Sequence, residues 1–315
     1  MKRDVTARVL ATLLGLTLFA APFLSAAQAQ DFDQLRRWCF EDSTDDQTIR
    51  GCAAVISAGI ESGDDLADAY DRQAYSYNVK GQYDKAIADY DHAIALGDKF
   101  PSAFLGRGNA HYAKAEYDRA IADFREVIHL APNDAGAFYA IGNAFRAKGS
   151  FSSALQAYDR AIELEPDFAA ALDNRGSLWG VQGQIARALR DYDRAIELAP
   201  NFVIALRNRG LAYEAIGRHA QAIDDYSHAL KLKPDFDVAL VNRGTARLKL
   251  GLVDAAIADY DAALKLQPRQ ASYLYLRGLA WKSKGDIARG DADLARATAI
   301  KADIARDMAP KAASR

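Results

Sequence analysis

The feature that most constrains this chain is a repeat of 34 residues that governs most of its length. Four kinds of residue return at that interval, in one common register. The glycines are Gly108, Gly142, Gly176, Gly210, Gly244 and Gly278, and the alanines are Ala86, Ala120, Ala154, Ala188, Ala222 and Ala256. The aromatic residues are Tyr90, Phe124, Tyr158, Tyr192, Tyr226 and Tyr260, and the prolines are Pro132, Pro166, Pro200, Pro234 and Pro268. A fixed interval of this size indicates a repeat architecture. We therefore do not expect the two globular domains that a length of 315 residues would otherwise suggest.

Each repeat predicts two helices. Within residues 203–236, apolar residues recur at helical spacing as far as Gly217, which breaks the first helix. A second apolar run follows until Pro234 ends it, and Asp235 is placed to cap the next helix. The sequence shows no alternating strand pattern. It therefore predicts an all-α stack of antiparallel helix pairs.

The recurring glycine needs a physical explanation, because Gly inside a helix costs about 1 kcal/mol relative to Ala. We expect a close approach of the two helices of a pair to offset this cost. In this prediction, the small Ala of the second helix faces the missing side chain and the aromatic residue packs beside them.

The residues Gly210, Tyr213, Gly217, Ala222, Tyr226, Ala229 and Pro234 have the spacing of the tetratricopeptide repeat, and the chain resembles that family. The resemblance implies a right-handed superhelical solenoid in which residues 67–304 form seven tandem units. Residues 30–66 resemble a degenerate N-terminal capping helix pair, and residues 305–315 form a short C-terminal tail. The phrase Asn242-Arg243-Gly244, followed later by Ala256-Ile257-Ala258-Asp259-Tyr260-Asp261, is similar to exported members of the family in Gram-negative bacteria. The seventh unit departs from the pattern, with Gly290 and Leu294 in place of Ala and an aromatic residue.

The N-terminus has the order of a secretory signal peptide. Basic residues precede the uncharged stretch 9–21, and a small-x-small site ends at Ala29. We predict a signal peptide over residues 1–29, cleaved after Ala29, and a periplasmic or secreted bacterial protein. The alternative is an uncleaved anchor, the one case in which a membrane contact is expected. Pro22 and the short apolar run argue against it.

Only two cysteines are present, Cys39 and Cys52, both in the segment that departs from the repeat. In an exported protein such a pair is expected to form a disulfide, which would join the two helices of the cap. The alternative is two free buried thiols.

Charged residues also follow the repeat. An Arg precedes the series glycine in five units, and an Asp lies 16 residues later in the same five. The pairs are Arg107 and Asp123, Arg175 and Asp191, Arg209 and Asp225, Arg243 and Asp259, and Arg277 and Asp293. Both residues change together in the third unit, to Ile141 and Ala157. We interpret them as structural ion pairs that are partly exposed and worth about 0–1 kcal/mol each. The alternative is a functional basic stripe.

The resemblance implies a concave face lined by the first helices, with the second, fifth, ninth and twelfth residues of each unit exposed to a partner. In the first three units the candidate binding residues are polar: Tyr75, Asn78, Asn109, Tyr112, Tyr139, Asn143 and Arg146. In the later units the candidate binding residues include more apolar side chains; they are Arg207, Val241, Leu248, Tyr275, Leu279 and Lys282. We predict a polar end that binds an extended peptide backbone and an apolar end that receives an apolar segment. The alternative is that packing between units, or the tail, uses the apolar side chains.

Composition and motifs favour binding over catalysis. The net charge of −2 argues against nucleic acid as a partner. We predict no catalytic residue, no metal site and no cofactor, because the five histidines are scattered and no HExxH, GxSxG or Walker-type motif occurs. The expected function is a non-enzymatic scaffold that binds a protein or peptide, in an envelope assembly. The alternative is a factor associated with polysaccharide or peptidoglycan, in which Trp179 and Trp281 would stack on sugars.

Overall fold

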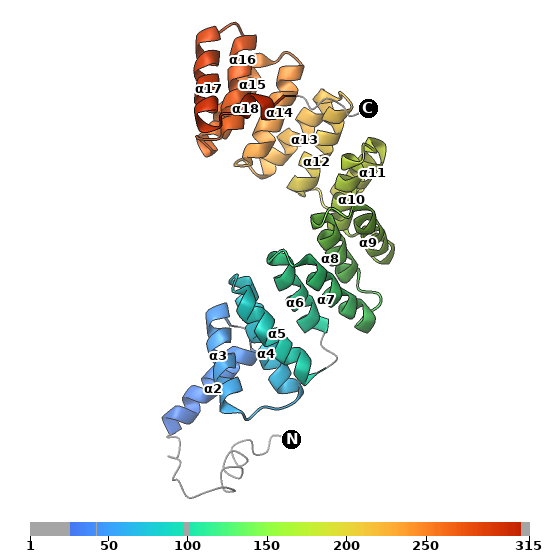
Figure 1. Cartoon of the computed structure of the whole chain (residues 1–315), viewed down its shortest axis with the longest axis vertical. Coiled ribbons are helices and arrows are strands. Elements are labelled where there is room, and N and C mark those ends of the chain that lie inside the picture. Colours follow the sequence, from blue (N-terminus) through green and yellow to red (C-terminus); the bar gives the residue numbers. More distant parts are fainter. Residues whose placement is uncertain (1–25, 42, 98–100, 310–315) are drawn as a thin grey trace, which may run out of the picture. The chain divides into compact units, whose positions relative to one another are not determined.

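The computed structural model describes residues 26–41, 43–97 and 101–309. Most of the predicted signal peptide (residues 1–25) and residues 310–315 of the predicted tail lie outside the described residues. Over the described residues the secondary structure is α-helical with short turns and no strand (Figure 1). The all-α fold class predicted from the repeat is confirmed.

The described residues form two compact units, one within residues 1–164 and one within residues 165–315. The helices of the first unit are α2 (Ala26–Phe40), α3 (Asp45–Ala58), α4 (Asp64–Val79), α5 (Tyr83–Leu96), α6 (Pro101–Ala113), α7 (Tyr117–Leu130), α8 (Ala135–Ala147) and α9 (Phe151–Leu164). Those of the second are α10 (Ala169–Val181), α11 (Ile185–Leu198), α12 (Val203–Ala215), α13 (His219–Leu232), α14 (Asp237–Lys249), α15 (Val253–Leu266), α16 (Ala271–Ser283), α17 (Ile287–Ile300) and α18 (Ile304–Asp307).

Consecutive helices in each unit pack side by side as pairs. The first helices of neighbouring pairs also contact one another: α4 contacts α6, α10 contacts α12, and α12 contacts α14. Each unit therefore has a row of first helices and a row of second helices, as in a solenoid.

The glycine series exists because an aromatic ring lies against it. A Cβ atom added to Gly142 or Gly210 would lie 2.5 Å from a ring carbon of Tyr158 or Tyr226, respectively. The rings are almost completely buried, with Tyr158 and Tyr226 0% exposed. The sequence placed the series Ala opposite the glycine with the ring beside it, and the structure adds that ring atoms lie nearest to Gly142 and Gly210, while the backbone oxygen of Ala256 lies 3.2 Å from a Cβ added to Gly244. A flat ring covers a larger area than an Ala methyl group, which offsets more of the cost of Gly in a helix.

A residue in the left-handed conformation makes the turn within the repeat pairs: Gly81, Gly149, Gly183, Gly217, Gly251 and Gly285, with Ala115 in the second repeat. Gly217 ends the first helix of its pair with φ +75°, a left-handed conformation that favours Gly.

The prediction that Asp235 caps the next helix is wrong. Helix α14 begins at Asp237, and Phe236 occupies the N-cap position without a capping side chain. The ring of Phe236 packs against the hydrophobic core of the second unit, so apolar burial governs how the chain enters this helix.

The predicted ion pairs are confirmed in all five repeats that carry them. Arg209 shows the geometry: its Nε and Nη2 atoms donate to the two carboxylate oxygens of Asp225 at 2.9 and 2.6 Å. Asp225 is only 5% exposed, so the expectation of partly exposed pairs was wrong for the carboxylates. The remaining nitrogen, Nη1, donates to Asp193 of the preceding repeat at 2.8 Å. Arg107, Arg243 and Arg277 bond in the same two directions, so these arginines tie their own helix pair together and join it to the previous pair.

Two of the repeats lack the arginine and show how the structure accommodates its absence. In the third repeat Ile141 and Ala157 are buried, at 6% and 7% exposed, and both belong to one hydrophobic cluster. In the first repeat Gln73 stands in place of the arginine, so Asp89 has no arginine opposite. The side chain of Gln73 donates to the backbone carbonyl of Ile49. One oxygen of Asp89 is buried without a hydrogen-bond partner, and burial raises the pKa of this carboxyl to about 6.

Replacing Gly210 with Ala should destabilise the protein by about 1–3 kcal/mol, because the added methyl group collides with the ring of Tyr226. Gly180 is the matched control. A Cβ atom there would lie 3.9 Å from the hydroxyl of Tyr192, so Gly180→Ala should stabilise by up to about 1 kcal/mol. Urea unfolding measures both changes. Equal effects of the two substitutions would contradict the role assigned to the ring.

Replacing Arg209 with Ala should cost about 3 kcal/mol of unfolding free energy, since it leaves the buried carboxylate of Asp225 without its charge partner. The double variant Arg209→Ile with Asp225→Ala copies the third repeat, where Ile141 and Ala157 stand at these positions. It should recover most of the loss. If the double variant were as unstable as Arg209→Ala alone, the unpaired charge would not be the cause.

Candidate functional site

The first unit holds a cavity of about 500 Å³, which we call the N-terminal cavity. Its walls come from the cap helices α2 and α3, from α4 and α5, and from α6. The residues that line it are Cys39, Glu41, Ser43, Asp45, Thr48, Asp71, Arg72, Tyr75, Ser76, Asn78, Tyr90, Ser102, Leu105, Gly106 and Asn109.

Three of the predicted binding residues meet in this cavity. Tyr75 and Asn78 come from α4, one turn apart, and Asn109 comes from α6. Tyr75 is 62% exposed although it is aromatic, so its ring is available at the mouth. The sequence did not predict that residues of the cap line the cavity. It also predicted Tyr90 only as a packing residue. The signal for Tyr90 was Gly106, a glycine outside the repeat series: a Cβ atom there would collide with the Tyr90 ring and hydroxyl.

The other predicted polar residues of the first unit do not line this cavity. Tyr112 packs against a neighbouring core cluster, and its ring centroid lies 5.6 Å from that of Tyr117. Asn143 accepts a hydrogen bond from the hydroxyl of Tyr158 at 2.7 Å. The ring of Tyr139 lies against the same Tyr158, with 5.9 Å between centroids. Arg146, on the same helix α8, is partly buried.

The charge of the N-terminal cavity is negative. Glu41, Asp45 and Asp71 line it, and Arg72 is the one cationic side chain among the lining residues described. The Nε atom of Arg72 is bound to Asp68 at 2.9 Å, outside the lining. The cavity therefore has an excess of carboxylates that its own arginine does not neutralise.

Asp71 is the deepest of these carboxylates. Burial raises its pKa to about 6, although a hydrogen bond from the Ser102 side chain acts in the opposite direction. Its Oδ1 atom is inaccessible to solvent and has no hydrogen-bond partner. The hydroxyl of Tyr90 bonds to the side chain of Asn78, and burial and the charge of Asp71 both raise the pKa of Tyr90. The cavity thus contains polar groups arranged around a carboxylate whose hydrogen bonding is incomplete.

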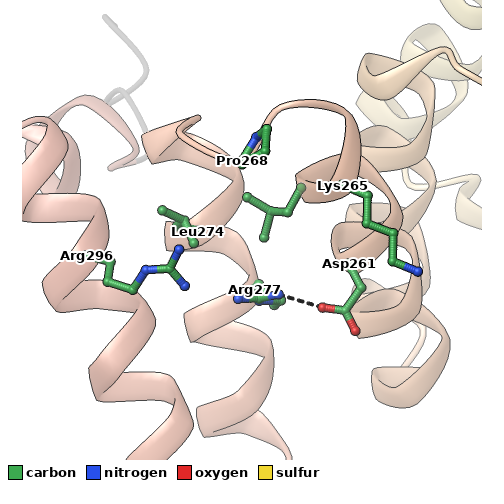
Figure 2. Close-up of a pocket in the computed structure, with 7 residues that line it drawn as sticks. Asp261, Lys265, Pro268, Leu274, Arg277 and Arg296 are labelled. Atoms are coloured by element: carbon green, nitrogen blue, oxygen red, sulfur yellow. Dashed lines mark hydrogen bonds and ion pairs between the residues drawn. The ribbon is translucent and has the colours of Figure 1, made fainter.

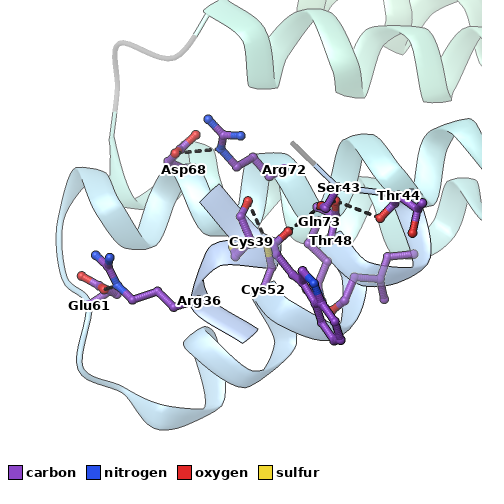
Figure 3. Close-up of a disulfide and its surroundings, with 12 residues drawn as sticks. Arg36, Cys39, Ser43, Thr44, Thr48, Cys52, Glu61, Asp68, Arg72 and Gln73 are labelled. Atoms are coloured by element: carbon purple, nitrogen blue, oxygen red, sulfur yellow. Dashed lines mark hydrogen bonds and ion pairs between the residues drawn. A yellow bond between two sulfur atoms is a disulfide. The ribbon is translucent and has the colours of Figure 1, made fainter. Parts of the chain in front are cut away.

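A disulfide between Cys39 and Cys52 joins α2 to α3 in the cap, which confirms the predicted bond (Figure 3). Both cysteines are 0% exposed, and Cys39 is part of the cavity wall. The cap is also fixed to the first repeat, because Gln73 of α4 donates to the carbonyl of Ile49 in α3 at 3.0 Å. The disulfide therefore supports one side of the N-terminal cavity.

The predicted residues of the second unit are less available. Val241 is 8% exposed and belongs to the hydrophobic core, so packing between helices uses it and it cannot receive a partner. Leu248 and Tyr275 are partly buried against the same core, whereas Leu279 remains 40% exposed. The Nη1 atom of Arg207 donates to Asn208 at 3.2 Å.

Lys282, the last predicted residue, is exposed and forms an ion pair with Asp291 at 2.8 Å. The predicted apolar end of the groove is therefore reduced to Leu248 and Leu279.

A second hollow, of about 320 Å³, lies in the second unit among α15, α16 and α17 (Figure 2). Its lining includes Arg277 and Asp261, which are bound to each other at 2.6 Å. These two residues belong to the repeated ion pairs between helix pairs. The hollow therefore follows from the stacking of repeats.

Within residues 26–41, 43–97 and 101–309, no three side chains of His, Cys, Asp or Glu are placed to hold a metal ion. In the same residues no helix combines the length and apolar character needed to cross a membrane.

The repeat matches family models along most of its length. A model described as "TPR repeat" matches residues 74–115, 108–145 and 142–179, and one described as "Tetratricopeptide repeat" matches residues 180–235 and 241–305. Together these matches cover well over half of the chain. The chain is a tetratricopeptide-repeat protein. No curated protein sequence gives a match.

Solved structures share this fold at low sequence identity. The pilF protein of Pseudomonas aeruginosa matches with a TM-score of 0.59 and 18% identity, over 67% of this chain and 97% of that chain. PilW, described as a type IV pilus biogenesis factor, matches with a TM-score of 0.59 and 19% identity, over 63% and 92%. YrrB, described as a TPR protein with an unusual peptide-binding site, matches with a TM-score of 0.50 and 20% identity, over 57% and 93%. These similarities show the solenoid fold, which is a scaffold for protein or peptide partners.

Removing the disulfide should loosen the cap of this tetratricopeptide-repeat protein selectively. Cys39→Ser with Cys52→Ser should lower the local stability of α2 and α3 by about 2–4 kcal/mol, the usual effect of losing a short cross-link. Hydrogen exchange measures this helix by helix, and α14 and α15 of the other unit serve as the control. Unchanged exchange in α2 and α3 would contradict a supporting role for the bond.

Proposed function

We propose that the protein is a non-enzymatic scaffold that binds an extended segment of another protein at the first helices of its N-terminal unit. The observation that carries this proposal is the N-terminal cavity, where Tyr75, Asn78 and Asn109 meet at an exposed mouth. Amide and phenol groups can donate to and accept from the backbone of an extended peptide, which has unpaired N–H and C=O groups. YrrB, which has the same fold, carries a peptide-binding site.

We further propose that the protein works in the bacterial periplasm, within an envelope assembly. The order of charged, apolar and small residues over 1–29 supports this location. The disulfide supports it as well, because such bonds persist in oxidising compartments.

Sugar binding is less favoured by the surroundings of the two tryptophans. The guanidinium of Arg187 lies 4.8 Å from the ring centroid of Trp179, and that of Arg289 lies 3.7 Å from the ring of Trp281. Both rings are also partly buried. Each ring therefore already has a cationic side chain of the protein close to it.

Site-specific photocrosslinking in the cells that make the protein tests the proposal. A benzoylphenylalanine at position 75 should capture a defined partner protein, because Tyr75 is 62% exposed at the cavity mouth. The control carries the same group at Val79, which is 57% exposed on the same helix but does not line the cavity. Equal capture at both positions, or no protein captured at position 75, would contradict the proposed binding site.

A further inference from the structure

We propose that the N-terminal cavity receives a basic side chain, lysine or arginine, from the peptide segment that the scaffold binds. The inference rests on the proposed function and adds the chemistry of the partner. Three observations support it: the charge of the cavity, an incompletely bonded carboxylate, and the shape of the walls.

The charge selects a cation. The carboxylates of Glu41, Asp45 and Asp71 face a single arginine in the lining, Arg72. That arginine is held by Asp68, so its charge is already engaged on the surface of α4. An anionic group, such as a peptide C-terminus or a phosphate, would meet three like charges and is disfavoured. A positively charged side chain would meet them as partners.

Asp71 carries a charge that the protein itself compensates poorly. Burial raises its pKa to about 6, and its Oδ1 atom is buried with no hydrogen-bond partner. A charged acceptor in this state is costly for the free protein. Oδ1 is closed to solvent, so an ammonium or guanidinium group in the cavity would act on Asp71 through the charge of its carboxylate. Entry of a basic side chain therefore lowers a cost that the free protein bears.

The walls suit the rest of such a side chain. Leu105 and Gly106 give an apolar surface for the methylene groups, and the exposed ring of Tyr75 is available for a cation–π contact. A volume of about 500 Å³ accommodates a long side chain. Asn109, exposed at the mouth, remains free to bond to the peptide backbone beside the anchor. This rim favours a residue within a chain over a free amine.

Peptide selection on the full mature protein tests the inference. Random twelve-residue peptides displayed on phage are selected against the wild-type protein, and the best peptide is synthesised. We expect one lysine or arginine position to be enriched. Replacing that residue with norleucine or citrulline should weaken binding about 10- to 100-fold, the range for losing a hydrogen bond to a charged group.

Protein variants locate the effect. Asp71→Asn keeps the shape of the side chain but removes its charge, and it should cause a similar loss that does not add to the loss from the neutral peptide. Asp45→Asn, at another wall of the cavity, should cause a smaller loss. Glu126→Gln is the control, because it removes a negative charge from an exposed position on α7 outside the cavity and should not change binding. Circular dichroism checks that each variant is folded.

The outcomes separate the two proposals. Peptides that bind at the cavity mouth without a basic residue, or that bind Asp71→Asn and Asp45→Asn as well as wild type, would overturn the inference and leave the peptide-binding function in place. Failure to select any peptide would overturn both. If spermidine bound as tightly as the selected peptide, the cavity would be a site for small amines, and the inference of a peptide anchor would be wrong.

Discussion

The contact between an aromatic ring and a glycine is the interaction on which the rest of this structure depends. The ring of Tyr226 covers Gly210 at a distance that excludes even one methyl group, and the same contact recurs at 34-residue intervals. It fixes how the two helices of a pair cross. With that geometry fixed, Arg209 and Asp225 come within bonding distance, and the first helices line up as a row.

Much of the fold could be predicted because the repeat supplies the same information many times. The helix pairs, the turn at Gly217 and the ion pairs followed from residue spacing alone. What the spacing could not give is which atoms fill a gap. Small Ala and a large ring are both buried beside the glycines, and only coordinates show that the ring takes the space. The expected cap at Asp235 failed because burial of Phe236 determines where α14 begins.

The candidate site was predictable only in part, since it combines repeated and unrepeated residues. Tyr75, Asn78 and Asn109 occupy positions that the repeat places on one face. The opposite wall comes from the cap, whose sequence lacks the pattern and so gave no positions to compare. Tyr90 reaches the cavity over Gly106, a single glycine without counterparts in other units. Val241 shows the converse, because a groove position by spacing became a core position by packing.

The arginine that joins neighbouring repeats also bears on how such a chain can change in length. Arg107, Arg209 and Arg277 each find their second partner 16 residues earlier, on the preceding repeat. In Arg243 that partner is Ser227, and loss of residues 203–236 would bring Asp193 to the same register. The sequence can therefore gain or lose a whole repeat here without stranding a buried charge. The same register sets a limit elsewhere, because loss of residues 135–168 would place Arg175 opposite Arg125, a like charge, so the ion pairs decide which 34-residue blocks the scaffold can lose.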